Sequence, residues 1–180
     1  MKLLPTQLRH IMPTARVSDI AKYLPYLNEW MPKYGITTVE RIRHFLAQVA
    51  QESGQLRYTE EIASGAMYDT GRLARILGNT PERDGDGQKN KGHGLIQITG
   101  GGNLRAITKD WNIDVFSDPD ILKQPEYAVR SACWFWWKAG LNKRVDKGAT
   151  VRQVTLRVNG GKNGLKEREE SYRRACEAIR

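Results

Sequence analysis

The chain has 180 residues, enough for one domain with a buried core and too few for two ordinary domains. Hydrophobic residues make up 39% and charged residues 27%, which is typical of a globular protein and excludes a disordered chain. Lys and Arg number 29 against 20 Asp and Glu, which favours polyanionic partners: nucleic acid, anionic lipid or an acidic cell-wall polymer. No stretch approaches the roughly 18 apolar residues of a membrane helix, so we expect no stable membrane insertion.

The N-terminal segment lacks the apolar core of a secretory signal, because Pro5, Gln7 and Arg9 interrupt it. We therefore expect synthesis in the cytoplasm. Cys133 and Cys176 have apolar or helical neighbours and are interpreted as free thiols that the fold buries.

Helical periodicity begins early in the chain. Apolar residues at helical spacing predict a helix over about 17–31, which Pro25 could split and which Pro32 and Gly35 should end. The next helix is the clearest. Thr37 and Glu40 fit a capping box at its start. Its apolar stripe consists of Val39, Ile42, Phe45, Leu46, Val49 and Ala50, and Gly54 fits a C-cap.

The second half of the chain combines a glycine-rich stretch with further helices. Residues 78–103 are polar and rich in glycine, with a short β-like core over 95–99. Helices are predicted over about 125–139, 150–158 and 165–179, the second of them opening with a Thr-x-x-Gln box. We therefore expect a mainly α domain with one small irregular or β segment.

Glu52 is the first candidate for acid catalysis. It follows Phe45, Gln48 and Val49 by seven, four and three residues, so it falls on the apolar face of its helix. An unpaired carboxylate there would lose hydration, which favours the protonated form that a general acid needs. The pattern alone leaves open a helix-end glutamate that turns out to solvent.

Glu60 and Glu61 lie in a polar stretch after the Gly54 break, where a carboxylate stays solvated and ionised, as a base that activates water should. Two carboxyls in contrasting environments are typical of glycoside hydrolysis, although paired glutamates are also common on surfaces. Between residues 91 and 100, Gln97 and Thr99 alternate with apolar neighbours and so share one face of a strand, suited to hydrogen bonding with sugars.

Other kinds of site are not indicated. The glycine-rich stretch contains neither of the known phosphate-loop patterns. Residues 84–87 are interpreted as a turn, since the glutamate of a calcium loop is missing, and the three histidines are too scattered for a metal site. We therefore expect no metal and no cofactor. The aromatic run 134–137 is interpreted as core rather than as a sugar-stacking surface.

Three ordered motifs carry a family resemblance: FLAQVAQESG at 45–54, GHGLIQITG at 92–100 and VNGG at 158–161. Together they resemble the family 19 glycoside hydrolases, which include plant-type chitinases and a branch of phage endolysins. The stretch 64–80 resembles the endolysin branch in particular. The similarity covers about residues 38–175.

The resemblance implies a lysozyme-like, two-lobed helical fold with the irregular segment at a cleft, and an inverting mechanism. It assigns Glu52 as the general acid, Glu61 as the general base with Glu60 as the alternate, and Thr99 as the hydroxyl that positions water. Substrate contacts are assigned to Gln97, Asn103, Asn159, Arg168 and Tyr58. The sequence departs from the family pattern at His93, where Arg is usual, and at Leu104, where an aromatic sugar contact is usual.

We therefore expect residues 1–180 to form a single catalytic domain, with the helical segment 1–36 packed on it, no separate wall-binding domain and a monomeric state. The expected substrate is the β-1,4-linked glycan of bacterial peptidoglycan, cut as by an N-acetylmuramidase, and nucleic acid is not an expected partner. The enzyme would reach the wall, on the periplasmic side, after a separate holin permeabilises the membrane. The alternatives are a chitinase, or a non-catalytic basic module that binds cell wall or nucleic acid.

Overall fold

The structure, a computed structural model, describes residues 2–180 and divides them into two compact units. Unit 1 comprises the chain up to Arg57 together with Cys133–Arg180, and unit 2 comprises Tyr58–Ala132. In the described residues both units are helical, and β-type pairing is limited to isolated bridges of His93 with Glu60 and Ile98. The expected mainly α fold class is therefore confirmed. None of the helices within residues 2–180 is long and apolar enough to cross a bilayer.

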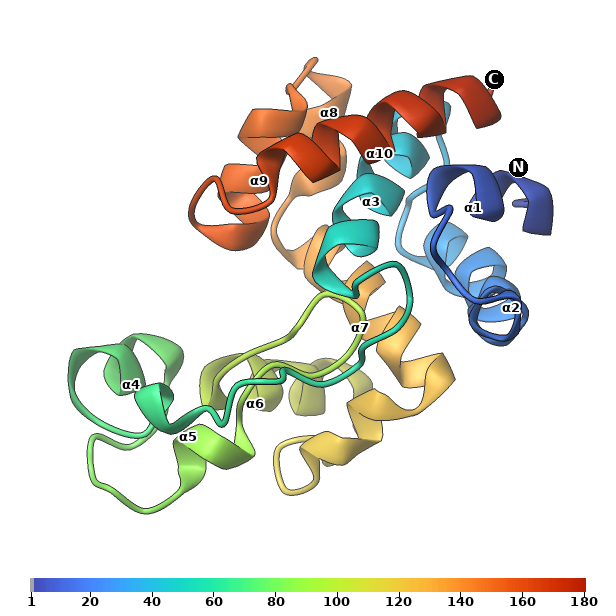
Figure 1. Cartoon of the computed structure of the whole chain (residues 1–180). Coiled ribbons are helices and arrows are strands. Elements are labelled where there is room, and N and C mark those ends of the chain that lie inside the picture. Colours follow the sequence, from blue (N-terminus) through green and yellow to red (C-terminus); the bar gives the residue numbers. More distant parts are fainter. Residues whose placement is uncertain (1) are drawn as a thin grey trace. The chain divides into compact units, whose positions relative to one another are not determined.

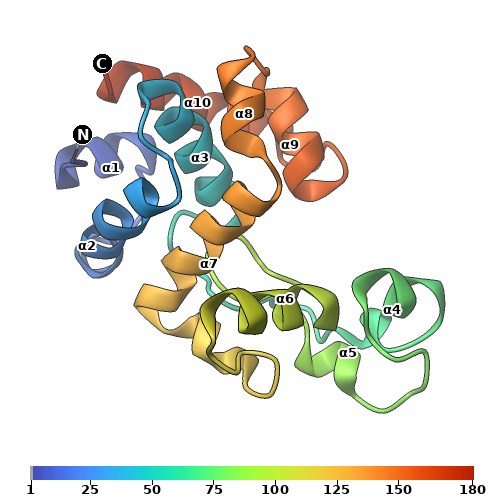
Figure 2. The same cartoon turned by 180° about the vertical axis from the view of Figure 1, so that it is seen from behind.

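Unit 1 is organised around α3 (Val39–Glu52). The unit also contains α1 (Pro5–Ile11), α2 (Val17–Lys33), the end of α7 (Pro125–Lys138), α8 (Leu141–Asp146), α9 (Val151–Asn159) and α10 (Leu165–Ala178). Within the unit, α10 lies along α3 and is also in contact with α1 (Figure 1). Seen from behind, α8 and α9 lie beside α3 (Figure 2).

The core of unit 1 forms where the apolar stripe of α3 meets the aromatic residues of α7. Phe45 is fully buried, and its ring meets that of Trp136 edge to face at 5.5 Å between centroids. Trp134 and Trp136 are buried, as predicted for core residues, whereas Trp137 is 51% exposed. Cys133 is a buried free thiol whose pKa burial raises, and Cys176 is a free, partly buried thiol.

The ends of α3 and α9 follow local rules that the sequence partly revealed. Thr150 and Gln153 form the predicted capping box of α9. At α3 the prediction was wrong by one residue, because Thr38 rather than Thr37 accepts the hydrogen bond from the Arg41 backbone. Gly54 follows α3 with φ +56°, a left-handed conformation that glycine adopts readily, and so ends the helix as predicted.

Helix α2 continues through both of its prolines, contrary to the predicted end at Pro32. A proline inside a helix removes one backbone hydrogen bond and leaves a carbonyl without its donor. Pro25 and Pro32 both lie on the exposed side of α2, where water can hydrate the freed carbonyls. Tyr34 and Gly35 then end the helix, with Gly35 at φ +72°.

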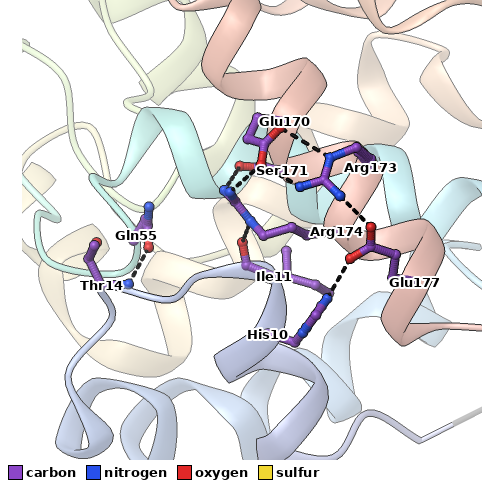
Figure 3. Close-up of polar contacts among 9 residues, drawn as sticks. All are labelled: His10, Ile11, Thr14, Gln55, Glu170, Ser171, Arg173, Arg174 and Glu177. Atoms are coloured by element: carbon purple, nitrogen blue, oxygen red, sulfur yellow. Dashed lines mark hydrogen bonds and ion pairs between the residues drawn. The ribbon is translucent and has the colours of Figure 1, made fainter.

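Polar side chains connect α10 to α1 (Figure 3). Glu177 accepts a hydrogen bond from His10 at 2.8 Å, and Arg174 donates to the Ile11 carbonyl at 3.0 Å. Gln7 adds a third contact by donating to the Ala178 carbonyl at 3.0 Å. These contacts fix the C-terminal helix against the N-terminal one.

Unit 2 consists of short helices connected by turns. Its elements are the 3-10 helix η1 (Ala66–Tyr68), α4 (Gly71–Leu77), α5 (Asp86–Lys89), α6 (Gly101–Trp111), the 3-10 helix η2 (Pro119–Lys123) and the start of α7. The predicted β-like core over 95–99 is wrong. Residues 94–97 form a turn with Gln97 at φ +57°, so the side chains of Gln97 and Thr99 do not alternate along a strand.

Asp69 organises the turn that precedes α5. It is 3% exposed, and its Oδ1 accepts hydrogen bonds from the backbone N–H groups of Gly85 and Gly87 at 2.9 and 3.0 Å. Carboxylate oxygens of Asp69, Asp84 and Asp86 lie within 4.8 Å of one another. The carboxylates of this cluster accept hydrogen bonds from backbone N–H groups and from the Thr80 hydroxyl. The predicted turn over 84–87 is confirmed only for residues 84 and 85, because α5 begins at Asp86.

Candidate functional site

Glu52 is the last residue of α3, and its side chain is 14% exposed. Its Oε1 accepts a hydrogen bond from Nη2 of Arg168 at 2.6 Å, while Nη1 of the same guanidinium donates to Oε1 of Gln48 at 2.5 Å. Gln48 and Glu52 are four residues apart and therefore share one face of the helix, which lets a single arginine reach both. Within residues 2–180, Oε2 of Glu52 makes no hydrogen bond.

Two expectations for Glu52 are thereby changed. The carboxylate does not turn out to solvent, and it is not the unpaired group that its place on an apolar face suggested. Arg168 reaches it from α10, 116 residues further along the chain, a contact that local spacing cannot reveal. One oxygen of the Glu52 carboxyl is therefore held by a cation, and the other accepts no hydrogen bond within residues 2–180.

Arg168 is itself 1% exposed. A buried guanidinium requires acceptors for its N–H groups, and here they are Glu52, Gln48 and, at 3.4 Å, the Asn163 carbonyl. Nε2 of Gln48 in turn donates to Thr155 at 3.3 Å. The arginine assigned to substrate contact therefore acts on the carboxylate of Glu52 in this structure.

Glu61 lies in unit 2 and is held by two neutral donors. Oε1 accepts from the Tyr68 hydroxyl at 2.8 Å, and Oε2 accepts from the Gly92 backbone N–H at 3.0 Å. A second backbone bond, from Glu61 N–H to the Gly92 carbonyl at 2.8 Å, fixes the two segments side by side. The carboxylate is therefore oriented without an ion pair.

Tyr68 is a functional candidate that the sequence reasoning missed. Burial and then the hydrogen bond to Glu61 raise the pKa of Tyr68 to about 12, so the phenol stays a donor at neutral pH. In the sequence, Tyr68 lies within the endolysin-like stretch 64–80. Its distance of seven residues from Glu61, across the turn at Gly65, gave no periodic signal.

Glu60 is in a different environment from Glu61. Its carboxylate pairs with Lys91 at 3.0 Å and Lys123 at 3.5 Å, and the hydrogen bond from Lys91 keeps the pKa of Glu60 below its usual value. Its backbone bridges to His93, which is 2% exposed. Burial lowers the pKa of His93, so this ring is neutral at pH 7, unlike the arginine usual at that position.

Local hydrogen bonds connect the remaining polar candidates of unit 2, Gln97, Thr99 and Asn103. Thr99 donates its hydroxyl proton to the Gln97 carbonyl at 2.9 Å, and Asn103 donates to the Thr99 carbonyl at 2.9 Å. Gly92 packs against both Glu61 and Gln97, because a Cβ on Gly92 would lie 2.7 Å from Oε1 of Gln97 and 3.3 Å from the Glu61 Cβ. These contacts place four of the assigned residues close together: Glu61, Gln97, Thr99 and Asn103.

Two residues assigned to substrate contact, Asn159 and Tyr58, have no hydrogen bond to Glu52 or Glu61 within residues 2–180. Asn159 ends α9 and is exposed, outside the hydrogen bonds of Glu52. Tyr58 is 41% exposed. Both remain predictions as sugar contacts.

Comparison with known proteins identifies the family. No protein-family model matches the sequence. Over 103 residues, 56% of this chain and 48% of the relative, the chain is 41% identical to a glycosyl hydrolase family 19 domain-containing protein of Haemophilus influenzae. Over 128 residues, 71% of this chain and 41% of the relative, it is 34% identical to an endochitinase of Arabidopsis thaliana. The chain thus spans about half the length of the curated relatives it matches.

Solved structures share the fold at low sequence identity. A bacterial family 19 chitinase matches with a TM-score of 0.78 at 17% identity, covering 99% of this chain and 95% of that chain. A class IV chitinase from Zea mays matches with a TM-score of 0.68 at 18% identity, covering 98% and 92%. The sequence relatives and the shared helical fold agree on one assignment. The chain belongs to glycosyl hydrolase family 19.

Proposed function

We propose that this chain hydrolyses the β-1,4 glycosidic bonds of bacterial peptidoglycan by an inverting general acid/base mechanism. The observation that supports it most is the environment of Glu52, a carboxylate with one oxygen held by the buried Arg168 and the other without a hydrogen bond in the described residues. A general acid needs a fixed carboxyl with one oxygen available to the glycosidic oxygen.

In the proposed reaction Glu52 protonates the leaving oxygen, and Glu61 accepts a proton from the attacking water. Glu61 is preferred to Glu60 as the base, because two lysines already occupy the carboxylate of Glu60, whereas Glu61 is held by neutral donors that fix its orientation. Thr99, next to Gln97, supplies a hydroxyl oxygen that can still accept a hydrogen bond from the water.

Peptidoglycan is preferred to chitin on the basis of charge. Chitin is neutral, whereas peptidoglycan carries carboxylates, and this chain has an excess of nine positive charges. The resemblance of residues 64–80 to the endolysin branch supports the same choice. A chitinase is the second candidate, favoured by the endochitinase and chitinase names of the relatives.

The test is digestion of purified peptidoglycan followed by mass spectrometry of the products. We expect soluble fragments that end in reducing N-acetylmuramic acid, and we expect Glu52→Gln to lower their release by about a hundredfold or more with unchanged circular dichroism. If the enzyme cleaves chitin oligomers but leaves peptidoglycan undigested, the result would favour the chitinase. A Glu52→Gln variant that retains activity within a few-fold of wild type would remove Glu52 from the role of acid.

A further inference from the structure

The net positive charge of the chain arises from one of its two units. Unit 1 contains twenty Lys and Arg against nine Asp and Glu, while unit 2 contains nine against eleven. Sequence order conceals this division, because unit 1 is assembled from both ends of the chain and basic residues occur throughout. The basic character therefore belongs to the unit that carries Glu52.

Within unit 1, seven exposed basic residues lie between residues 143 and 166. This basic segment covers the exposed side of α8, α9 and the turn into α10, and consists of Lys143, Arg144, Lys147, Arg152, Arg157, Lys162 and Lys166. The same stretch contains a single acidic residue, Asp146, and Arg41 already binds both of its oxygens, at 2.8 and 2.5 Å. Among the described residues, none of the seven basic side chains has an ion pair.

Like charges gathered without counter-charges repel one another and do not stabilise the fold. Seven such charges on neighbouring elements therefore suit an anionic partner. Helix α9 contacts both α8 and α10, so the seven basic residues lie on adjoining elements of unit 1.

The basic segment continues to the proposed acid. The Asn163 carbonyl accepts a hydrogen bond from Arg168, which binds Glu52. Gly164 packs against the side chain of Gln51, the neighbour of Glu52, so closely that a Cβ there would lie 2.4 Å from its Nε2. Lys162 and Lys166 flank this contact in the chain and therefore lie near the proposed acid.

We propose that the basic segment binds the carboxylates of the peptide-bearing glycan strand next to the bond that is cut, and so selects an anionic over a neutral glycan. This rests on the proposed function. Nucleic acid fits less well, because residues 141–166 contain no aromatic side chain on which bases could stack. A membrane surface fits less well, because Val151 and Val154 of α9 are buried in the core and only Leu156 is exposed.

The test compares two substrates that differ only in charge. Peptidoglycan freed of phosphate polymers is used as it is, or after its carboxylates have been converted to amides with carbodiimide and ammonia. The test variant is Arg152→Glu with Arg157→Glu. The control, Arg72→Glu with Arg75→Glu on α4, makes the same change in net charge at exposed arginines of unit 2. The rate of hydrolysis is measured at low salt from the release of reducing ends. Binding is measured by co-sedimentation of the protein with the insoluble peptidoglycan, with each variant also carrying Glu52→Gln.

We expect wild type and control to prefer the unmodified peptidoglycan by at least about threefold in both rate and binding, and the test variant to lose most of this preference. If the test variant does not fold, Lys143→Glu with Lys147→Glu on α8 replaces it. Equal preference in test variant and control would overturn the inference, as would a preference that appears only when phosphate polymers are left on the wall. Carboxylate-dependent binding without any reducing ends would support the basic segment and contradict the proposed hydrolase.

Discussion

The hydrogen bond between Tyr68 and Glu61 can be removed by a substitution that changes little else. Tyr68→Phe deletes the hydroxyl that donates to Oε1 of Glu61 at 2.8 Å and leaves the ring in place. A hydrogen bond to a charged group contributes about 1.5–3 kcal/mol, so we expect kcat on peptidoglycan to fall about tenfold or more, with little change in KM. Tyr26→Phe is the control, because that hydroxyl has no hydrogen bond in the described residues. Equal kcat values for the two variants would show that Tyr68 does not position the base.

Apart from Tyr68, the residues of the candidate site could be named individually from the sequence, but most of their contacts could not. Motif resemblance named Glu52 and Arg168, yet the pairing between them depends on the packing of α10 on α3. The hydrogen bond from Gly92 to Glu61 likewise joins segments 31 residues apart. A contact between distant segments exists only in the folded chain, so residue spacing gives no evidence of it.

At the scale of elements, the start of α5 depends on a close approach of two backbones. A Cβ on Gly87 would lie 2.2 Å from the backbone nitrogen of Asp69, whereas one on Gly85 would meet nothing within 4 Å. Gly85 has φ +90°, so Gly85→Ala should lose about 1 kcal/mol of unfolding free energy from backbone strain alone. Gly87→Ala should lose about 2 kcal/mol or more, because backbone atoms must move. Urea denaturation measures both, and a Gly87→Ala variant as stable as Gly85→Ala would contradict this packing.

Two buried histidines make stability depend on pH. Burial lowers the pKa of both His44, on α3, and His93 below that of an exposed histidine. The unfolded chain therefore takes up protons first as the pH falls through about 6.5, and stability is lost below that value. His44 stacks on Tyr172 of α10 at 4.4 Å between ring centroids, with Glu40 as the nearby charge that partly opposes the shift.

We therefore expect the unfolding free energy to decrease between pH 7.5 and 5.5, and His44→Phe to reduce that decrease while keeping an aromatic ring against Tyr172. Denaturant titrations at the two pH values provide the measurement. Carboxylates titrate mainly below this range and contribute little to the difference. A variant with the same loss of stability as wild type would mean that the His44 ring has the same pKa in the folded and the unfolded chain, and so would contradict this account.

The sequence predicted long elements better than short ones. α3, α7, α9 and α10 each present an apolar stripe over several turns, and the Thr150–Gln153 box marks the start of α9. Helices such as α4 and α8, with seven and six residues, are too short for a periodic pattern and were not predicted. The run over 95–99 alternated like a strand, but its apolar residues are buried around a turn, which the positive φ of Gln97 creates.

At the scale of the whole molecule, the net charge of the chain conceals two units of opposite sign. Unit 1, with its excess of basic residues, carries the proposed acid, and unit 2, with a slight acidic excess, carries the proposed base. This division was not visible in the sequence, because the two parts of unit 1 are separated by all of unit 2. The relatives and structural neighbours establish the family and the fold, and the substrate is decided by activity measurements.

The stereochemistry of the first product tests the proposed mechanism most directly. The wild-type chain is mixed with soluble β-1,4-linked peptidoglycan strands, and the new reducing end is followed by proton NMR before mutarotation. Direct attack by water on the face opposite the leaving group, with Glu61 as base and Glu52 as acid, inverts the anomeric centre. The account predicts the α-anomer as the first product. A β-anomer as the first product would contradict it and would require a covalent or substrate-assisted route in which Glu61 does not activate water.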